Sequence, residues 1–373
     1  MNILLIGEVF SENLGDQIVY YSNQYQLKEQ FPNASFYVLD LMGRNHISSS
    51  ALSPKSNKNG LLNKLKPRIS SHILLKWISA FKKKKYYLSK IQRDIDLAVF
   101  VGGQLVSDTF ATYIYAILKI LNKYEIPVIF NAVGLGVLEN RHAKKLYEKC
   151  LKFNCVKYIS CRCDQERMNS FLFKEKMVQS TFDSAVLASQ IYDIERDKSS
   201  KIIGLGIMKS SRYKEDDLIA YWSEIIKYLE TEGIQWKVFT TGQCADYLLS
   251  EKILELNGFG DEKLLSRPEK PEELVAHISE FCGIISFRLH SHIIAYSLGI
   301  SSLAIVWDEK IRDFFKKVDL EKNVFQFNDM SILDNISDLF VEEMSEKEIK
   351  KNKQLSVLNL NNAALNALNV KND

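Results

Sequence analysis

The chain has 373 residues, of which 46% are hydrophobic and 25% charged, and its 49 basic and 46 acidic residues leave a net charge of +3. These values are ordinary for a soluble globular protein and exclude a general attraction to nucleic acid. No apolar stretch reaches the length of a membrane-spanning helix, and the first residues lack the basic start of a secretion signal. We therefore expect a cytoplasmic protein with two domains, because one core seldom fills this length.

The start of the chain predicts a strand, a glycine-containing loop, a helix and a second strand. The strands are expected at residues 3–6 and 35–39, and the helix at residues 18–30. This order opens a Rossmann-like half, although its glycines do not follow G-x-G-x-x-G and so do not indicate a dinucleotide site. The loop contains Asn13-Leu14-Gly15-Asp16, and its aspartate is expected to cap the helix.

A basic insertion interrupts this pattern between about residues 44 and 93. Residues 44–60 are rich in Ser, Asn, Lys and Pro and predict a loop. Residues 61–93 contain ten Lys or Arg and no acid, interleaved with leucines, isoleucines and a tryptophan. A basic amphipathic helix of this kind is typical of proteins that bind anionic membrane surfaces. It is equally consistent with an insertion that packs on its own domain, and both interpretations stay open.

Buried-strand patterns, each followed by a loop and a helix, recur through the rest of the chain. A polar stretch at 193–200 has no apolar period and marks a domain boundary. The predicted fold is α/β, with two Rossmann-like doubly wound domains facing each other across a cleft. We expect an N-terminal domain at 1–195, a C-terminal domain at 196–345 and a helical tail at 346–373. The later strands are expected at 97–101, 128–132, 158–161, 202–207, 235–240, 283–287 and 302–307.

Loops at the predicted strand ends contain the candidate site residues. The carboxyl ends of parallel strands meet at one edge of a sheet, where α/β proteins bind ligands. Each loop also has an ordinary explanation, because glycines after strands usually form tight turns. These loops contain Asn13–Asp16, Gly102–Gln104, Gly134–Gly136, Arg162, Asp183 and Arg288–His290.

The stretch from Gly283 to Lys310 is the most informative of these segments. It predicts a strand at 283–287, a polar break at Arg288–His292, a helix at 293–298 closed by Gly299, and a further strand at 302–307. A helix N-terminus already favours an anion, and an arginine directly after an apolar strand needs an anionic partner or solvent. We infer an anion site at the carboxyl edge of a parallel sheet. His292, on a different helix face from His290, is expected to be structural.

Seven short segments together resemble the polysaccharide pyruvyl transferase family. The resemblance runs from Ile3 to about Phe315, without the basic insertion and the tail, and depends on the order and spacing of the segments. The chain departs from the family pattern at Gln104, Cys163 and Ser184, where the family usually has glycine, aspartate and proline. The segments are N-L-G-D at 13–16, V-F-V-G-G-Q-L at 99–105, A-V-G-L-G at 132–136, S-C-R-C-D at 160–164, F-D-S-A at 182–185, R-L-H-S-H-I-I-A at 288–295 and W-D-E-K at 307–310.

The resemblance implies a GT-B-like fold and an enzyme with phosphoenolpyruvate as donor and a sugar as acceptor. Two sugar hydroxyls would add to C2 of the donor, phosphate would leave, and a pyruvate ketal would remain on a cell-surface glycan. A donor with a phosphate and a carboxylate needs several cations, and protonation of its C3 needs a general acid. The expected partners are phosphoenolpyruvate, a saccharide acceptor, lipid-linked or free, and an anionic membrane surface bound through 61–93 at the inner face of the cytoplasmic membrane.

The resemblance also assigns roles to residues of this sequence. His290 is the candidate general acid, Asp16 is the candidate base or acceptor ligand, and Arg162 is expected to reach the donor from the other domain. No cofactor and no metal are expected, and the six cysteines predict buried thiols. The expected phosphoenolpyruvate ligands are Arg162, Arg288, Leu289, His290 and Lys310, and the expected acceptor or loop residues are Asn13, Gly15, Asp16, Gly102, Gly103 and Gln104.

Two other functions stay open. A GT-B glycosyltransferase that uses a nucleotide sugar would share the architecture. The sequence beside Arg288 lacks a convincing pair of carboxylates for a ribose, which favours the smaller anionic donor. An inactive scaffold at the membrane, with residues 61–93 as its working part, is kept open by the three departures from the family pattern.

Overall fold

The computed structural model describes residues 1–46, 73–92, 94–163, 165–170, 178–341 and 344–369. The chain forms two compact units, each made of segments that are distant in the sequence. The domains expected from the sequence, at 1–195, 196–345 and 346–373, stay a prediction about independently folding parts. Unit 1 comprises Met1–Ser11, Asn23–Phe182 and Val357–Asp373, and unit 2 comprises Glu12–Ser22 and Asp183–Ser356.

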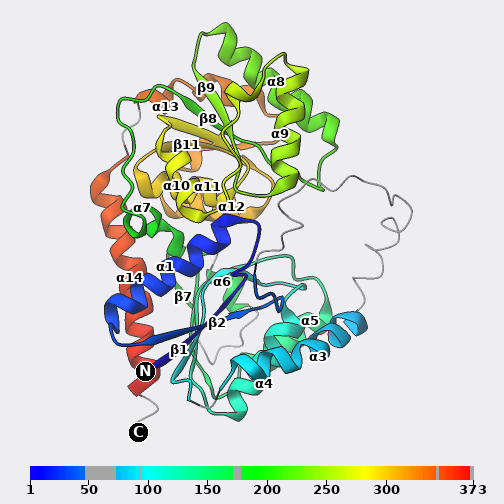
Figure 1. The fold of residues 1–373 in the computed structure, drawn as a ribbon, viewed down its shortest axis with the longest axis vertical. Helices are drawn as coiled ribbons and strands as arrows, with labels where there is room; N and C mark the ends of the chain where they lie inside the picture. The colour runs from blue at the N-terminus through cyan, green and yellow to red at the C-terminus, as the bar shows by residue number, and fades with distance from the viewer. Residues whose placement is uncertain (47–72, 93, 164, 171–177, 342–343, 370–373) are drawn as a thin grey trace. The chain divides into compact units, whose positions relative to one another are not determined.

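Unit 1 is built on a parallel sheet with the strand order β2-β1-β3-β5-β6-β7, in which β4 also pairs with β5 (Figure 1). Its central strands are buried along almost their whole length, as expected for a parallel sheet covered on both faces. Helices α1 (Leu14–Gln30) and α14 (Glu346–Asn369) each belong partly to unit 1 and partly to unit 2. The other elements of unit 1 are β1 (Asn2–Gly7), β2 (Ser35–Asp40), α3 (Ile73–Lys90), β3 (Leu97–Phe100), β4 (Gly103–Val106), α4 (Ala111–Lys123), β5 (Val128–Leu135), α5 (Arg141–Cys150), β6 (Val156–Cys161), α6 (Gln165–Asn169) and β7 (Gln179–Ser180).

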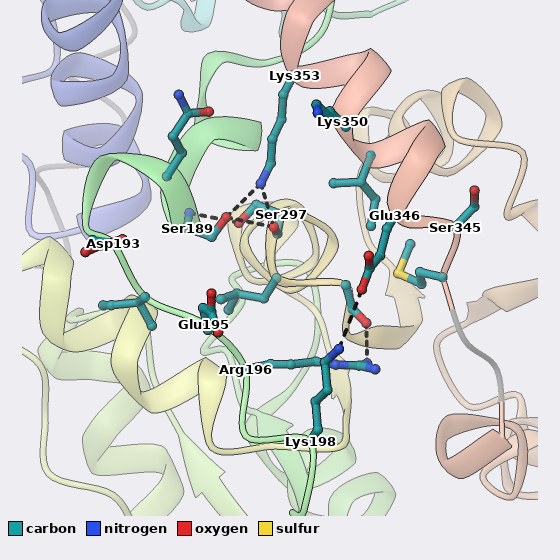
Figure 2. A pocket seen from close by; sticks show the side chains of 16 residues that line it. Ser189, Asp193, Glu195, Arg196, Lys198, Ser297, Ser345, Glu346, Lys350 and Lys353 are labelled. Carbon is teal, nitrogen blue, oxygen red and sulfur yellow. Dashed lines mark hydrogen bonds and ion pairs between the residues drawn. The ribbon is translucent and has the colours of Figure 1, made fainter.

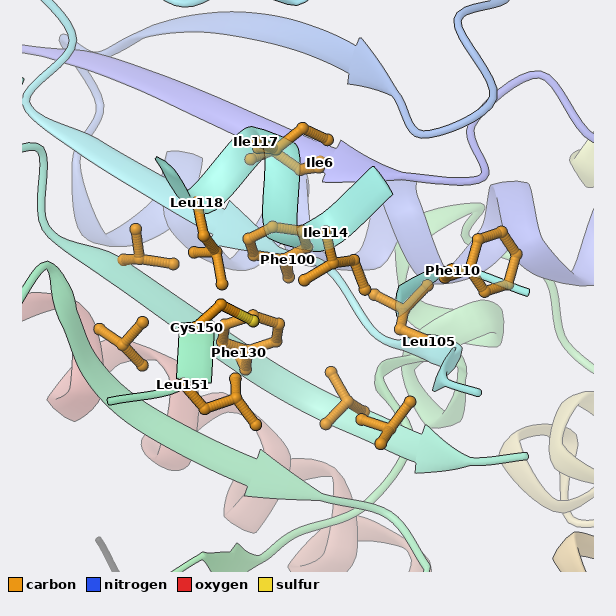
Figure 3. Packing of buried hydrophobic residues seen from close by; sticks show 14 of the residues in the cluster. Ile6, Phe100, Leu105, Phe110, Ile114, Ile117, Leu118, Phe130, Cys150 and Leu151 are labelled. Carbon is orange, nitrogen blue, oxygen red and sulfur yellow. The ribbon is translucent and has the colours of Figure 1, made fainter. Parts of the chain in front are cut away.

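The core of unit 1 lies between the sheet and helices α4 and α5 (Figure 3). Phe100 of β3 and Phe130 of β5 stack with their ring centroids 4.3 Å apart. Ile117 and Leu118 follow Ile114 by three and four residues, which places the three side chains on the face of α4 that packs on these rings. Burial of each such side chain stabilises the fold by about 1.5–3 kcal/mol.

Unit 2 is built on a second parallel sheet, with the strand order β12-β11-β10-β8-β9. Its core contains two fully buried tryptophans, Trp222 and Trp236. The elements of unit 2 are α7 (Ala188–Ile191), β8 (Ile203–Gly206), α8 (Glu215–Thr231), β9 (Trp236–Phe239), α9 (Cys244–Leu256), α10 (Pro271–Ser279), β10 (Gly283–Ser286), α11 (Leu289–Leu298), β11 (Ser301–Val306), α12 (Glu309–Lys317), β12 (Val324–Gln326) and α13 (Asp338–Val341), with short 3₁₀ turns at Ser184–Leu187, Asp261–Lys263, Glu321–Asn323 and Met330–Asn335.

Both sheets follow the doubly wound pattern. In each unit the first strand lies between the second and the third, so the strand order reverses between β1 and β3 in unit 1 and between β8 and β10 in unit 2. Open α/β sheets bind ligands at the carboxyl ends of the strands that flank this point. The prediction of an α/β fold with two Rossmann-like domains is confirmed.

Two expected loops are partly strand. Gly103 and Gln104 open β4, and Gly134 lies inside β5. Gly102 and Gly103 have φ values of 107° and 82°, a region that favours glycine, and they turn the chain from β3 into β4. The glycine pair therefore redirects the chain so that β4 pairs with β5.

Two helices begin earlier than expected. Helix α1 begins at Leu14, so Asp16 lies in its first turn and does not cap a helix that begins near residue 17. Helix α11 begins at Leu289, directly after Arg288, so His290 also lies in a first turn. Both helices start in polar sequence that lacks apolar periodicity, and apolar periodicity was the signal used to place them.

Candidate functional site

The start of α11 lies at the carboxyl edge of the unit 2 sheet, at the end of β10. The Ser286 hydroxyl donates a hydrogen bond to the Gly206 carbonyl on β8 and accepts one from the Arg288 backbone N–H, each at 3.1 Å. Every residue of α11 is buried, and Gly299 ends the helix with φ 72°. The helix start is therefore fixed to the switch point of the sheet, and its first N–H groups have no partner within the helix.

Arg288 binds two side chains from the start of α9. Its Nε and Nη2 donate to Asp246 Oδ2 at 3.0 and 2.5 Å, and Nη2 also donates to Gln243 Oε1 at 2.6 Å. Asp246 is fully buried, and the Arg288 side chain is 13% exposed. The anionic partner that the sequence required for Arg288 is thus, at least in part, a carboxylate of the protein itself.

Burial raises the pKa of the Asp246 carboxyl, and the positive charge of Arg288 offsets part of that rise. The backbone N–H of Lys209, which follows β8, donates to Asp246 Oδ1 at 2.8 Å. Asp246 therefore links the ends of β8 and β10, the two strands that flank the switch point.

His290 lies between two carboxylates. Its Nδ1 is 4.0 Å from Asp16 Oδ1, and its Nε2 is 3.9 Å from Asp183 Oδ2. The His290 side chain is 8% exposed and that of Asp183 3%, whereas Asp16 is 21% exposed. Asp183 Oδ1 accepts the backbone N–H of Ala185 at 2.8 Å, which fixes this carboxylate at the start of a 3₁₀ turn.

The first turn of α1 is packed directly on His290. A Cβ atom added to Gly15 would lie 2.2 Å from His290 Nδ1, so only glycine fits at this position without a shift of the ring. The backbone N–H of Leu14 donates to the Thr241 carbonyl at 3.0 Å, and the Asn13 side chain donates to Asp16 Oδ2 at 3.2 Å. The structure thus brings Asn13, Gly15 and Asp16 together with His290.

His292 is structural in this arrangement. It is fully buried, and its Nε2 lies 3.0 Å from the Ser286 carbonyl, to which it donates. Burial lowers the pKa of His292 to about 4, so the ring is neutral at ordinary pH. No hydrogen bond to its Nδ1 is present in the described part of the chain.

Lys310 and Arg212 lie on the ring of Trp307, at the end of β11. The Lys310 Nζ is 4.5 Å from the ring centroid, and the Arg212 guanidinium carbon is 5.3 Å from it. Arg212 also donates to the Trp307 carbonyl and lies 3.5 Å from Asp308, while Trp307 donates to the Phe287 carbonyl at 2.7 Å. Two cations therefore lie at the end of the strand next to β10, although Arg212 had no place among the expected residues.

The remaining expected residues lie in unit 1. Arg162 follows β6 and is 8% exposed, and its Nε would be 3.0 Å from a Cβ atom on Gly134. The Gly103 carbonyl would be 3.3 Å from the same atom, and the Gln104 side chain donates to the Leu135 carbonyl at 3.4 Å. Arg162, Gly103 and Gln104 thus gather at the carboxyl edge of the unit 1 sheet. A contact of Arg162 with the donor stays a prediction.

The part of the basic insertion that is described packs on unit 1. Residues 47–72 lie outside the described residues. Tyr87 of α3 is fully buried and donates to the Leu41 carbonyl at 2.9 Å, and Lys83 Nζ lies 4.6 Å from the centroid of the Tyr113 ring. Lys82, Lys84 and Lys85 are exposed. None of the helices in the described part of the chain combines the length and the apolar composition that crossing a membrane requires.

A pocket of about 780 Å³ lies at the other end of α11 (Figure 2). Its half-buried cations bind the carbonyl groups that end the helix. Lys353 Nζ lies 2.9 Å from the Ser297 carbonyl and 2.7 Å from the Ser189 hydroxyl, and Arg196 Nη1 lies 2.5 Å from the Gly299 carbonyl. Cations at a helix C-terminus stabilise the free carbonyls, so these contacts have a structural explanation.

Sequence reasoning missed Asp246 and Gln243 and gave Asp183 no role. Asp246 and Arg288 are separated by 42 positions, and an aspartate in the first turn of a helix usually needs no partner beyond the helix dipole. Asp183 was predicted to lie in one of the candidate loops and in the F-D-S-A segment of the family pattern, without a role of its own. The available signal for Asp246 was the arginine directly after an apolar strand, which needs an anionic partner or solvent.

Solved structures share the architecture of two Rossmann-like units seen here, which defines a GT-B-like protein. UDP-GlcNAc 2-epimerase from Neisseria meningitidis matches with a TM-score of 0.60 at 12% identity, over 99% of each chain. UDP-GlcNAc 2-epimerase from Methanocaldococcus jannaschii matches with a TM-score of 0.57 at 11% identity, over 98% of this chain and 100% of that one. At these identities the likeness shows the fold alone. A search of curated protein sequences finds no match.

The family model of polysaccharide pyruvyl transferase matches residues 13–309. The matched stretch begins at Asn13 and includes Arg162, Arg288 and His290, while Lys310 lies just outside it. The chain therefore belongs to the polysaccharide pyruvyl transferase family and is a transferase of polysaccharide biosynthesis. The resemblance inferred from the seven sequence segments is confirmed.

Proposed function

We propose that this protein transfers the enolpyruvyl group of phosphoenolpyruvate to two hydroxyls of one sugar in a glycan. Both hydroxyl oxygens bond to C2 of the donor, C3 gains a proton to become a methyl group, and the C2–O bond to phosphate breaks. Phosphate leaves with the second hydroxyl proton, so the acceptor gains one pyruvate less one water. The reaction requires a cationic donor site, a general acid and a base.

One observation carries this proposal: an arginine and a carboxylate-flanked histidine lie together at the start of α11. Arg288 and His290 are separated by a single residue at the switch point of the unit 2 sheet, where doubly wound proteins bind ligands. The N–H groups of the first turn of α11 favour an anion as well. Leu289, which opens the helix, supplies one such group.

His290 is the proposed proton donor to C3. Its two ring nitrogens lie 3.9 and 4.0 Å from the carboxylates of Asp183 and Asp16, which gives a protonated ring two oppositely charged neighbours. Asp16, the more exposed of the two carboxylates, is the proposed base for an acceptor hydroxyl. Asn13 and Gly15 position Asp16 and the ring.

Lys310 and Arg162 are proposed to supply the positive charge that the donor needs in addition to Arg288. Lys310 lies at the end of β11, next to β10, and its ammonium group lies over Trp307. Arg162 lies with Gly103 and Gln104 in unit 1, and Gly102 shapes the same turn. We propose Arg162 as a donor ligand and Gly102, Gly103 and Gln104 as acceptor ligands because they lie in the family segments at 160–164 and 99–105.

The test is an assay with purified protein, phosphoenolpyruvate and candidate saccharides, lipid-linked and free. We expect phosphate release together with an acceptor mass gain equal to one pyruvate less one water. His290→Gln should lower turnover by about 10²–10⁴-fold, the usual contribution of general acid catalysis. His142→Gln, at an exposed histidine of α5, is the matched control and should leave turnover unchanged. Turnover of a nucleotide sugar with no phosphate release from phosphoenolpyruvate would overturn the proposal.

We further propose that the lysine run of α3 attaches the protein to an anionic membrane surface, where a lipid-linked acceptor is made available. The supporting observation is that Lys82, Lys84 and Lys85 are exposed together with Leu88, which is 41% exposed. Each lysine near an anionic membrane contributes about 1 kcal/mol to binding.

A further inference from the structure

Asp246 is a fully buried carboxylate at the switch point of the unit 2 sheet, and the proposed reaction does not use it directly. Its two oxygens accept hydrogen bonds from residues that follow the two strands on either side of the switch point. Oδ1 accepts the backbone N–H of Lys209, which follows β8, and Oδ2 accepts Nε and Nη2 of Arg288, which follows β10. The carboxylate therefore fixes the guanidinium relative to the backbone of the neighbouring strand.

The hydrogen bonds of Arg288 leave one side of its guanidinium for a ligand. A guanidinium has five N–H groups: one on Nε and two on each Nη. Asp246 and Gln243 take the Nε group and both Nη2 groups. No hydrogen bond from Nη1 to the described residues is present, and the Arg288 side chain is 13% exposed.

Only a carboxylate can make both sets of contacts at position 246. Lys209 N–H and Arg288 are both donors, so each oxygen of residue 246 must accept. An asparagine has the same shape but a single acceptor oxygen, and its NH₂ group would face one of the two donors. Asp246→Asn therefore loosens either the strand end or the arginine while the volume of the side chain is kept.

A buried ion pair is not explained by stability alone. Replacement of such pairs by apolar residues of similar volume is often neutral or stabilising, because desolvation of the charges offsets their attraction. Burial disfavours the charged form of Asp246, and Arg288 compensates for only part of that cost. The buried charge of Asp246, which is costly to desolvate, is explained if Arg288 must keep a fixed orientation.

We propose that Asp246 is a positioning residue for the anionic donor, which holds Arg288 by its Nε and Nη2 so that Nη1 is presented to one anionic group of the ligand. Gln243 supports this orientation through its contact with Nη2. The inference rests on the proposed function for the identity of the donor. The tether between Asp246 and Arg288 can be measured without the donor.

The contacts of Arg288 with Asp246 and Gln243 limit the way in which the donor is bound. With Nε and Nη2 occupied, Arg288 cannot grip a phosphate or a carboxylate with two nitrogens of its fork, which is the usual geometry of a strong arginine–anion contact. It offers the two N–H groups of Nη1 instead. The remaining donors for that anionic group must come from the first turn of α11 and from other side chains.

The first measurement detects the tether by NMR. The ¹H–¹⁵N signal of Arg288 Nε is assigned through its disappearance in Arg288→Lys. We expect a slowly exchanging signal in the wild-type protein, because a buried carboxylate protects this N–H, and its loss or rapid exchange in Asp246→Asn. A wild-type signal that exchanges as fast as those of exposed arginines would overturn the tether whatever the enzyme does.

The second measurement is the affinity for phosphoenolpyruvate by calorimetry, together with the KM for donor and acceptor. Asp246→Asn should weaken donor binding by about tenfold or more and leave the acceptor KM unchanged, because a hydrogen bond to a charged group contributes about 1.5–3 kcal/mol. Gln243→Met keeps the size of the side chain and removes one acceptor, and it should weaken donor binding by a smaller factor. The Gln243 side chain makes no cap hydrogen bond to α9, and its backbone carbonyl, which accepts from Asp246 and Tyr247, is kept in the variant.

Glu215→Gln is the matched control for charge. Glu215 lies after the same strand, β8, and pairs with Lys209 and Lys252 rather than with Arg288. The Glu215→Gln substitution removes one negative charge near the sheet edge and leaves the contact between Asp246 and Arg288 intact. Donor affinity should therefore stay within about twofold of the wild type. An equal effect of Glu215→Gln and Asp246→Asn would reduce the role of Asp246 to its charge and overturn the positioning role.

The outcomes separate the tether from the proposed donor. A tether signal that is lost in Asp246→Asn, together with weaker donor binding, supports the proposal. A tether signal with no binding of phosphoenolpyruvate by the wild-type protein overturns the proposed function, and with it the role of Asp246 in donor binding. Wild-type donor affinity in an Asp246→Asn protein that has lost the signal overturns the positioning role alone.

Discussion

The backbone of Gly15 lies against the ring of His290, so the smallest change at this residue tests the importance of ring position. The methyl group of Gly15→Ala would be 2.2 Å from His290 Nδ1, which no real contact allows, and the ring or the first turn of α1 must shift. A displacement of about 1 Å at a reacting group typically costs about 10²-fold in rate.

We therefore expect Gly15→Ala to lower turnover by about this factor while the free energy of unfolding changes far less. Gly233→Ala is a poor control because φ there is 64°, whereas φ at Gly260 of the same unit is −107° and the nearest atoms to an added methyl group belong to the end of the exposed Glu262 side chain. Gly260→Ala should leave turnover unchanged. Wild-type turnover in Gly15→Ala would show that the ring position is not critical.

His292 makes the stability of the protein depend on pH. Its pKa is about 4 in the folded protein and about 6.5 in the unfolded chain, so between these values acid protonates the unfolded chain first. The contribution of His292 is complete above pH 6.5 and is lost as the pH falls towards 4, with a total of about 3 kcal/mol.

The measurement is urea unfolding at several pH values between 7 and 4, in the wild-type protein and in His292→Gln. We expect the free energy of unfolding to fall more steeply with acid in the wild type. His277, whose pKa is also lowered by burial, is present in both proteins and cancels in the comparison. Parallel pH profiles would contradict the buried neutral state of His292.

Single residues of the site were predictable where a local rule applied. Arg288 and His290 follow an apolar strand and precede a helix, and this pattern alone indicates an anion site. The aspartates around His290 and Arg288 follow from tertiary contacts between segments that are 42 to 274 positions apart, and such contacts leave no local signal. The local rule for Asp16 predicted a helix cap, but the helix begins at Leu14, four residues before the predicted start, and Asp16 lies in its first turn beside His290.

At the scale of single elements, α3 divides into a packed face and a charged face. Tyr87 and Lys83 pack on unit 1, so removal of the whole helix would damage the fold as well as any membrane contact. The sharper change is the triple charge reversal Lys82→Glu, Lys84→Glu and Lys85→Glu on the exposed side. Loss of three lysine contacts should weaken binding to anionic vesicles by about 3 kcal/mol, or about 100-fold.

The vesicle experiment uses phosphatidylserine-containing vesicles, with neutral phosphatidylcholine vesicles for comparison. Turnover of a free saccharide should be unchanged in the triple variant, since these three exposed lysines are not among the residues proposed for the donor and acceptor sites. Reversal of Lys350, Lys351 and Lys347 on α14 removes as much positive charge elsewhere and is the matched control. Equal loss in both variants would mean that net charge, and not α3, determines vesicle binding.

Elements were predictable from the sequence where their burial was complete. The central strands of both sheets are apolar along their length because helices cover both faces, and they were placed to within one or two residues in most cases. The short, partly exposed strands β7 and β12 were not predicted. Strand β4 was missed because its two glycine-dependent backbone angles turn the chain within a segment that resembles a loop. The starts of α1 and α11 were placed late because their first turns are polar and serve the site.

On the scale of the whole molecule, a short segment near the N-terminus belongs to the unit formed by the C-terminal half. Glu12–Ser22 forms part of unit 2, where Leu14 is 2% exposed and contacts Thr241 and Gly242. The segment brings Gly15 and Asp16 to His290. The site in unit 2 therefore cannot form from the C-terminal half of the sequence alone.

This arrangement predicts how local stability is distributed. Parts of a protein that form one cooperative unit open together, and hydrogen exchange detects that opening. Ile226→Ala in the core of unit 2 and Ile117→Ala in the core of unit 1 each remove a buried isoleucine and should each destabilise their own unit by about 2–5 kcal/mol. We expect exchange in residues 16–22 to accelerate with Ile226→Ala and to respond far less to Ile117→Ala.

The comparison is made by mass spectrometry on the full chain, with peptides from β3 and β8 as references for each unit. The helical hydrogen bonds of α1 continue past residue 22 into unit 1, so a response to both variants would mean that the helix joins the two units into one cooperative structure. A response to Ile117→Ala alone would place the segment with its neighbours in the sequence. In that case the contact between Gly15 and His290 would be the weaker attachment of α1, and the proximity of Asp16 to His290 would be lost with local opening of unit 2.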